Sequence, residues 1–293
     1  MPKAPLIART VRDLRAHVDA WHKAGHTVGL VPTMGALHEG HISLLKLAQA
    51  RTTRTITSIF VNPTQFAPNE DFDKYPRTWD DDLAKLSAAQ CDLVWAPTPP
   101  EMYPPGFATH VVPGGAAEGL ETDYRPHFFR GVATVCCKLF TQTRADVAVF
   151  GEKDFQQLAV IQQMVRDLNL PISIVPGPTV READGLAMSS RNRYLSPEHR
   201  AAAVTLHRVL QDIAAVVRAH DNMAAVARAE GKIEAATQAG MKTIIAAGFT
   251  KVDYLCVRDA ETLKTFLAAH NRPARILVAA WLGQTRLIDN IGV

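Results

Sequence analysis

Apolar runs and helical patterns alternate along residues 27–177. Short segments rich in β-branched residues predict strands at 27–32, 55–62, 91–97, 145–151 and 172–177. Segments whose apolar residues recur every three or four positions predict helices at 41–51, 81–90, 129–143 and 154–168. The predicted strands are apolar at nearly every position, as is typical of strands buried on both faces. The alternation therefore predicts an α/β fold, with a Rossmann-like parallel sheet covered by helices.

The pattern changes near residue 185. Residues 198–239 form a long, alanine-rich stretch with helical spacing, and three short strand patterns follow at 252–258, 274–281 and 285–291. We therefore expect two domains. A Rossmann-like domain would span residues 1–184, and a smaller α+β domain with a short antiparallel sheet would span residues 185–293.

Composition and charge narrow the class of protein. The 32 basic and 29 acidic residues leave a net charge of +3 without a long basic run, which argues against binding to nucleic acid or to a membrane surface. We find neither a signal peptide pattern nor the roughly 20 consecutive apolar residues of a membrane span. The four cysteines have no CxxC spacing, so we expect reduced, mostly buried thiols. The chain is therefore predicted to be soluble and cytoplasmic.

The stretch PTMGALHEGHIS, residues 32–43, follows the first of these strands and opens a helix. His38 and His41 lie at positions i and i+3, on one face of its first turn. Backbone N–H groups and the positive end of the helix dipole favour an anion there. Gly35 permits a tight turn, and Gly40 permits close approach of a ligand. Two imidazole N–H donors beside this site suit a nucleotide triphosphate. The alternatives are histidines satisfied by backbone carbonyls, a zinc site completed from elsewhere in the chain, and a chance match.

A second strand end carries GEKDFQQL, residues 151–158. Asp154 is a plausible N-cap, and Lys153 precedes it. A lysine at a helix start is electrostatically unfavourable unless an anion binds beside it. Gln157, one turn into the helix, suits a small polar substrate. The alternatives are an exposed lysine and an ordinary helix glutamine.

A third polar stretch, LAMSSRNRYL, covers residues 186–195. Ser189, Ser190 and Arg191 offer hydroxyl groups and a guanidinium fork that suit phosphate oxygens. A loop at a domain junction also suits closure over a ligand. The alternative is a plain interdomain linker.

A fourth stretch, FVNPTQF at residues 60–66, again follows a strand. Asn62 and Gln65 carry neutral donors and acceptors that suit a hydroxy acid or an amine. The acidic run that includes Asp81 and Asp82 begins the next helix and suits Mg²⁺ bound with a triphosphate. The simpler alternative is that acids in a first helical turn match the helix dipole.

Together these stretches resemble one protein family, the pantoate–β-alanine ligases. The matching segments are PTMGALHEGH, FVNPTQF, HFFRGVATV, FGEKDFQQL and MSSRNRYLS. The HxGH element alone marks a wider superfamily of nucleotidyltransferases, whereas the full set is specific. The chain has no Walker-type, GxGxxG or GxSxG motif that would favour another class.

The resemblance implies an activity. Such enzymes condense (R)-pantoate with β-alanine to form pantothenate, for coenzyme A biosynthesis. Pantoate and ATP first give pantoyl adenylate and diphosphate, and β-alanine then displaces AMP. The family also implies a cytoplasmic homodimer that uses Mg²⁺, with small molecules as its partners, and a C-terminal domain that acts as a lid.

The resemblance also implies site residues. The ATP site would comprise Met34, Gly35, Ala36, Leu37, His38, Glu39, Gly40, His41, Gly151, Glu152, Lys153, Asp154, Val180, Met188, Ser189, Ser190 and Arg191. His41 would be the proton donor, and Gln65 and Gln157 would bind substrate. From its side-chain chemistry, we expect Asn62 to bind substrate with them. We expect His41 to stabilise the departing diphosphate and Lys153 to bridge the pantoate carboxylate and the α-phosphate, with His38 and Arg191 as further catalytic residues.

Two features depart from the family pattern. Cys136 and Cys137 lie where we expect small β-branched residues, and Lys85 lies where the family can have a polar neighbour of the metal. Two other functions remain open on this reading. One is a nucleotidyltransferase that keeps the nucleotide on its product, and the other is a non-catalytic nucleotide-binding protein.

Overall fold

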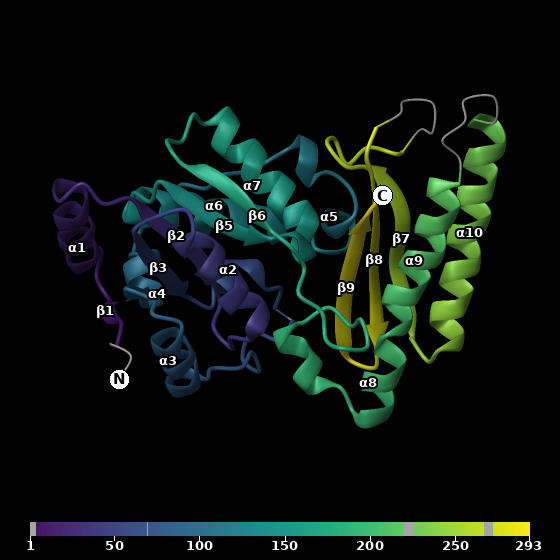
Figure 1. Cartoon of the computed structure of the whole chain (residues 1–293), viewed down its shortest axis with the longest axis horizontal. Coiled ribbons are helices and arrows are strands. Elements are labelled where there is room, and N and C mark those ends of the chain that lie inside the picture. The colour runs from purple at the N-terminus through teal and green to yellow at the C-terminus, as the bar shows by residue number, and fades with distance from the viewer. Residues whose placement is uncertain (1–3, 69, 220–225, 267–271) are drawn as a thin grey trace. The chain divides into compact units, whose positions relative to one another are not determined.

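The computed structural model describes residues 4–68, 70–219, 226–266 and 272–293 (Figure 1). Contacts within the chain group it into two compact units. The first comprises Met1–Glu152 and Gln156–Val180, and the second comprises Lys153–Phe155 and Arg181–Val293. The predicted domain boundary after residue 184 stays a prediction.

The first unit is built on a six-stranded parallel sheet. Its strands are β1 (Leu6–Ala8), β2 (Val28–Thr33), β3 (Arg54–Ile59), β4 (Leu93–Trp95), β5 (Val147–Gly151) and β6 (Ser173–Gly177). They lie in the order β1-β4-β3-β2-β5-β6, and every neighbouring pair is parallel. The predicted parallel α/β sheet is confirmed. Strand order reverses between β2 and β5, which is where sheets of this kind bind ligands.

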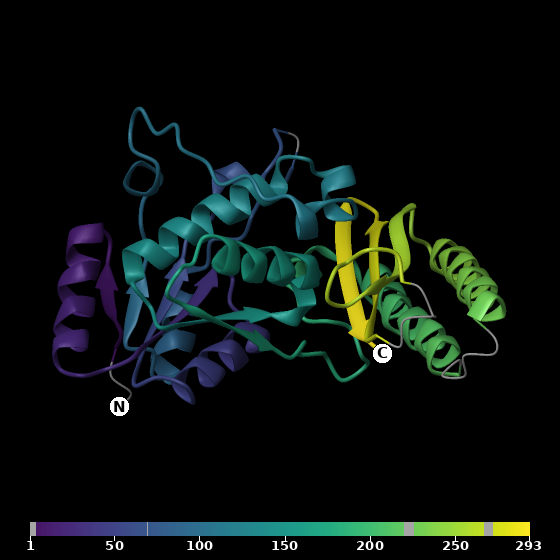
Figure 2. The same cartoon turned by 90° about the horizontal axis from the view of Figure 1, so that it is seen from above.

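Helices cover both faces of this sheet, with α2 on one side and α6 on the other (Figure 2). The helices are α1 (Val11–Lys23), α2 (Glu39–Gln49), α3 (Trp79–Ala88), α4 (Pro99–Met102), α5 (Glu121–Tyr124), α6 (Phe128–Thr143) and α7 (Phe155–Asp167). Three 3₁₀ turns are η1 (Pro63–Gln65), η2 (Gly115–Ala117) and η3 (Glu152–Asp154). The sequence analysis predicted neither β1 nor α1.

A buried cluster fixes α2 against the sheet. Ile42, Leu45 and Ala48, spaced three residues apart, pack with Val31 of β2 and Val149 of β5. Burial of each large side chain contributes about 1.5–3 kcal/mol of hydrophobic stabilisation. The apolar face of α2 therefore holds its polar N-terminus beside the ends of β2 and β5.

The second unit contains a three-stranded antiparallel sheet, as predicted. Its strands are β7 (Lys251–Asp259), β8 (Ala274–Leu282) and β9 (Thr285–Gly292), in the order β7-β8-β9. The helical elements are η4 (Ser190–Tyr194), α8 (Pro197–Ala203), α9 (Thr205–Arg218) and α10 (Val226–Ala246). Part of the alanine-rich stretch, residues 220–225, lies outside the described residues.

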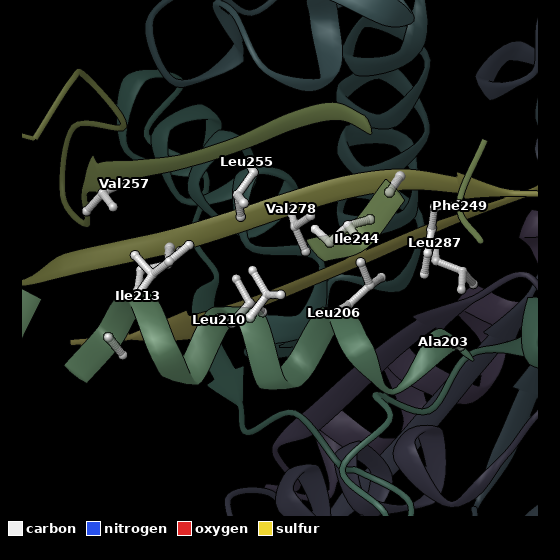
Figure 3. Close-up of a cluster of buried hydrophobic side chains, with 14 of the residues drawn as sticks. Ala203, Leu206, Leu210, Ile213, Ile244, Phe249, Leu255, Val257, Val278 and Leu287 are labelled. Carbon is white, nitrogen blue, oxygen red and sulfur yellow. The ribbon is translucent and has the colours of Figure 1, made fainter. Parts of the chain in front are cut away.

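One apolar cluster forms the core of this unit (Figure 3). Leu206, Leu210 and Ile213 of α9 meet Leu255 of β7 and Val278 of β8 there. The helix contributes residues three or four apart, and the strands contribute inward-facing residues of the sheet. This packing gives the second unit a core of its own.

The four cysteines are free, with Cys91 and Cys136 buried and Cys137 and Cys256 partly buried. Burial raises the pKa of the Cys136 thiol, which therefore stays protonated and inert inside α6. In the part of the chain that is described, none of the helices combines the length and the apolar character needed to cross a bilayer.

Candidate active site

The two predicted histidines form a capping box at the N-terminus of α2, in which each ring accepts a hydrogen bond from a backbone N–H group. His38 is the N-cap, and its Nδ1 accepts a hydrogen bond from the Gly40 N–H at 3.2 Å. His41 Nδ1 accepts one from the His38 N–H at 3.3 Å. The two rings lie 4.1 Å apart between centroids. Because each Nδ1 is an acceptor, the proton of each neutral ring lies on Nε2. The pair therefore carries two Nε2–H donors at the end of β2.

The backbone N–H groups before this pair are already occupied by a carboxylate. Asp82 of α3 accepts hydrogen bonds from the N–H groups of Ala36 at 2.9 Å and of Leu37 at 2.7 Å. Gly35 and Ala36 have φ values of +81° and +51°. Successive N–H groups in such a turn form a concavity that binds an anion. Here that anion is the Asp82 carboxylate, so these two N–H groups do not bind a phosphate. The predicted phosphate site therefore depends mainly on the imidazoles.

The residues predicted to bind Mg²⁺ fit a metal ion poorly. Asp82 is 1% exposed, and its two oxygens accept the two N–H groups above and a hydrogen bond from the Thr78 hydroxyl. Asp81 is exposed on the same helix. Mg²⁺ needs carboxylate lone pairs at about 2.0–2.1 Å and retains several waters. Across the described ranges, we find no group of three or more His, Cys, Asp or Glu residues arranged to hold a metal ion.

Asn62 and Gln65 follow β3, the neighbour of β2. The Asn62 side-chain N–H₂ donates to Gln65 Oε1 at 2.8 Å and to the Gly131 carbonyl at 3.3 Å. Its Oδ1 accepts a hydrogen bond from the Tyr103 hydroxyl at 2.9 Å. Asn62 is 1% exposed and Gln65 8% exposed. The hydrogen bonds of the Asn62 side chain therefore fix the orientation of the Gln65 side chain.

Arg125, which the sequence interpretation missed, holds the same turn. Its Nη2 donates to the Gln65 carbonyl at 2.8 Å, and its guanidinium pairs with the carboxylates of Glu70 and Glu121. The guanidinium carbon also lies 4.0 Å from the centroid of the Phe128 ring. A planar fork that meets two carboxylates, a carbonyl and a ring face is geometrically restrictive. Its position just before the HFFRGV segment was the only sequence signal.

The segment after β5 also begins where the strand order reverses, between β2 and β5. β2 and β5 are paired at Gly29–Val147 and Leu30–Ala148, so their carboxyl ends lie at the same edge of the sheet. Gly151 ends β5, and Glu152 starts η3. Farther on, Gln157 is half-buried. Its neighbour Gln156 is buried and bonded to the backbone of Ala116, Gly119 and Glu121.

Lys153 and Asp154 belong to the second unit. Lys153 Nζ lies 3.8 Å from Asp154 Oδ1, and the Lys153 carbonyl accepts a hydrogen bond from Asn290 Nδ2 at 2.7 Å. The side chain of Asn290 in turn accepts from Arg275 Nε at 2.6 Å. The Arg275 guanidinium carbon lies 4.1 Å from the Phe155 ring centroid. These contacts tie Lys153 and Phe155 to β8 and β9. The structure places a 3₁₀ turn at Glu152–Asp154, and α7 begins at Phe155.

The serine–arginine stretch forms the start of η4 in the second unit. Ser189 is its N-cap and accepts a hydrogen bond from the Arg191 N–H at 3.3 Å. Ser190 is buried, and Met188 is half-buried. Arg181 anchors the preceding hairpin through two hydrogen bonds to Asp289, at 2.7 and 2.9 Å. Val180, half-buried, is the last residue of the first unit.

The structure therefore gathers part of the predicted site within the first unit. The loop of residues 34–41 and the pair Asn62–Gln65 follow β2 and β3, and Gly151 ends β5. These three strands are neighbours in the sheet. Lys153, Asp154 and residues 188–191 lie in the second unit. Their approach to the histidines stays a prediction.

The sequence of this chain matches one family of proteins along nearly its whole length. The family model described as Pantoate-beta-alanine ligase matches residues 6–292. The chain is 57% identical over 295 residues to pantothenate synthetase 2 of Bradyrhizobium diazoefficiens, covering all of both chains. It is 53% identical over 292 residues to pantothenate synthetase of Caulobacter vibrioides, covering 99% of each.

Solved structures from the same family also superimpose on this chain. Pantothenate synthetase from Thermus thermophilus superimposes with a TM-score of 0.88 at 42% identity, over 98% of each chain. Pantoate-beta-alanine ligase from Francisella tularensis, in a complex with beta-gamma ATP and beta-alanine, gives a TM-score of 0.80 at 32% identity, over 98% of this chain and 97% of that one.

Proposed function

The chain belongs to the pantoate–β-alanine ligase family, and from this premise we propose that it makes pantothenate from (R)-pantoate, β-alanine and ATP. The proposed reaction passes through pantoyl adenylate and releases diphosphate and AMP. The reciprocal capping of His38 and His41 is the observation that carries the proposal. It directs the protons of both rings to Nε2, where neutral imidazoles donate to phosphate oxygens.

The first step forms an acyl–phosphate bond. The pantoate carboxylate attacks the α-phosphorus of ATP, and the bond to the β-phosphate oxygen breaks. Charge grows on the departing diphosphate, and preorganised donors lower the barrier most at such a position. We assign His41 Nε2–H to the departing diphosphate and His38 to the neighbouring phosphate oxygens. Lys153 and Arg191 would neutralise the remaining charge.

The second step transfers the pantoyl group. The neutral β-alanine amine attacks the acyl carbon, AMP leaves as the bond between that carbon and the phosphate oxygen breaks, and the nitrogen releases one proton as the amide forms. Gln65, oriented by Asn62 and Arg125, and Gln157 supply neutral amides that suit the pantoate hydroxyl and carboxylate groups. Because the acyl adenylate reacts with water, we assign residues 188–191 to closing the site.

We propose that magnesium binds together with ATP. The ion neutralises phosphate charge when it is bound. Because Asp82 is buried and fully engaged, we assign the ion to the phosphates and solvent rather than to α3.

The deciding experiment is a coupled assay for AMP in which each substrate is omitted in turn. We expect release of AMP only when ATP, pantoate and β-alanine are all present, and loss of about 100-fold or more in turnover for His41→Gln. Diphosphate release with the nucleotide kept on the product would favour a nucleotidyltransferase. Binding of ATP without turnover would favour a non-catalytic protein.

We also propose a cytoplasmic homodimer. The support is the match to the family over residues 6–292. Light scattering of the purified protein tests the dimer, since one chain has a mass of 32.0 kDa.

A further inference from the structure

We propose that Asp82 and Lys85 of α3 are positioning residues that hold the ATP loop in its active shape, and that they do not bind magnesium. This inference rests on the proposed function, because it concerns the loop that leads into His38 and His41. It assigns a purpose to the acidic start of α3 that neither a metal site nor the helix dipole explains.

The loop adopts a backbone conformation that needs an external acceptor. Gly35 and Ala36 both have positive φ, at +81° and +51°, and alanine rarely takes this conformation. The turn directs the N–H groups of Ala36 and Leu37 toward one point. Both residues are buried, so water does not reach these groups. An unsatisfied buried N–H is unfavourable, and the loop therefore depends on the atom at that point.

Asp82 supplies that acceptor from 45 positions beyond Leu37 in the chain. Its Oδ2 accepts from the Ala36 N–H at 2.9 Å, and its Oδ1 accepts from the Leu37 N–H at 2.7 Å. The Thr78 hydroxyl donates to the same Oδ1 at 3.2 Å. A carboxylate with three donors has the partners that burial of its charge requires.

Lys85, one turn farther along α3, makes a further contact with the same loop. Its Nζ donates to the Leu37 carbonyl at 2.7 Å. Leu37 is therefore bound at both its N–H and its C=O by the same helix. The next residue is His38, whose backbone N–H and side chain form the reciprocal cap with His41. A shift of Leu37 would move both imidazoles relative to the phosphates.

The same contacts argue against a metal ligand. The lone pairs of Asp82 already face the positive ends of two N–H dipoles and one O–H dipole. A cation at that position would face those hydrogens. Lys85 adds a positive charge on the same helix, one turn away.

Substitutions in α3 distinguish a positioning role from a magnesium-binding role. Asp82→Asn keeps the shape but turns an N–H₂ group toward a backbone N–H. Lys85→Leu removes the second contact, and Lys85→Arg retains a cationic donor. Asp80→Asn is the matched control, because Asp80 is exposed and its replacement removes the same charge from the same turn. Asp81→Asn tests the metal interpretation directly.

For Asp82→Asn we expect kcat/KM for ATP to fall roughly 10- to 100-fold, because small displacements at a reacting site cost that much. The KM for β-alanine should stay within about twofold of the wild type, since that substrate enters the second step. Hydrogen exchange at the amides of Ala36 and Leu37 should accelerate about tenfold or more. Lys85→Leu should show a smaller loss in the same parameters, and Lys85→Arg should recover most of it. Asp80→Asn should match the wild type.

Three results would overturn the proposal. One is wild-type exchange and wild-type kcat/KM for ATP in Asp82→Asn or in Lys85→Leu. Another is a parallel rise in the Mg²⁺ requirement of Asp81→Asn and Asp82→Asn that excess Mg²⁺ reverses. A third is an equal loss for all substrates together with a lower melting temperature, in both Asp82→Asn and Lys85→Leu.

The wild type keeps this test separate from the test of function. If the wild type releases no AMP in the complete mixture, the proposed function fails. The exchange measurement still decides whether Asp82 holds the loop.

Discussion

At the scale of single residues, the histidines of this chain combine a structural and a chemical role. A helix N-cap is usually Ser, Thr, Asp or Asn, but here it is His38, whose ring nitrogen accepts the Gly40 N–H. The same hydrogen bond sets the ring tautomer and so directs a donor away from the helix. Substitution at this position therefore separates capping from chemistry.

We predict that His38→Asn keeps the stability of the protein and lowers its activity. Asparagine is a favoured N-cap, so the melting temperature should stay near that of the wild type, whereas His38→Ala should lose about 1 kcal/mol. Both variants lack the imidazole, so both should lose about tenfold or more in AMP release. Thermal denaturation and the AMP assay measure the two effects. An asparagine variant with full turnover would contradict the role of the ring.

A second residue-scale prediction concerns Asp253, whose side chain is 1% exposed. Burial alone would raise the pKa of this carboxyl, but Lys251 at 2.8 Å and Arg286 at 2.7 Å outweigh it and lower the pKa below its ordinary value. A carboxyl whose folded-state pKa is lowered adds stability above its unfolded pKa, near about 3.9, and loses it as pH falls through the folded value.

Asp253→Asn should therefore destabilise the protein at pH 7 by roughly 3 kcal/mol, since it removes the carboxylate that compensates the buried charge of Arg286. The difference from the wild type should shrink as pH falls below about 4. Unfolding in urea from pH 7 to pH 3 measures this difference. A difference that stays constant across the range would contradict the assignment.

At the scale of elements, α6 and η1 approach so closely that only glycine fits between them. A Cβ atom added at Gly131 would lie 2.4 Å from the Thr64 carbonyl oxygen, which is shorter than any van der Waals contact. Thr64 lies between Asn62 and Gln65, so the space at Gly131 bears on the proposed substrate turn.

Gly131→Ala should displace that turn, destabilise the protein by about 1–3 kcal/mol and raise the KM for pantoate several-fold. The matched control is Gly231→Ala in α10, where a Cβ meets nothing within 4 Å. There, alanine should stabilise the helix by about 0.5–1 kcal/mol and leave the kinetics unchanged. Calorimetry and steady-state kinetics on both variants make the comparison. A Gly131→Ala enzyme with wild-type KM for pantoate would refute this role of the close contact.

At the scale of the whole molecule, the proposed reaction draws on both units. The histidines lie in the first unit, whereas Lys153 and Arg191 lie in the second. Each unit has its own core, so loss of a cationic side chain in the second unit should affect chemistry far more than folding.

We predict that Lys153→Ala and Arg191→Ala each lose about 100-fold or more in turnover, with melting temperatures close to the wild type. Lys232→Ala, which removes an exposed lysine of the second unit, is the control and should be fully active. The AMP assay and thermal denaturation measure both properties. If either variant retains more than half of the wild-type turnover, the catalytic role proposed for that cation is wrong.

The sequence by itself determined the parallel α/β sheet, the later antiparallel sheet and the polar stretches that follow the strands. Hydrophobic periodicity is a local signal, and long apolar runs such as 27–32 and 145–151 carry it strongly. The strand β1 has only three residues, which is too short to show a period, and it was missed. The helix α1 was also missed, although Leu14 and Val18 have the spacing of one helical face and are buried.

Only the tertiary structure decided which distant groups meet. It placed β5 beside β2, turned the carboxylate of Asp82 to the amides of Ala36 and Leu37, and joined Arg125 to the Gln65 turn. No local pattern encodes these contacts, because each depends on how separate elements pack around a common core. A carboxylate at a helix start looks the same in sequence whether it faces solvent, a metal ion or a buried N–H.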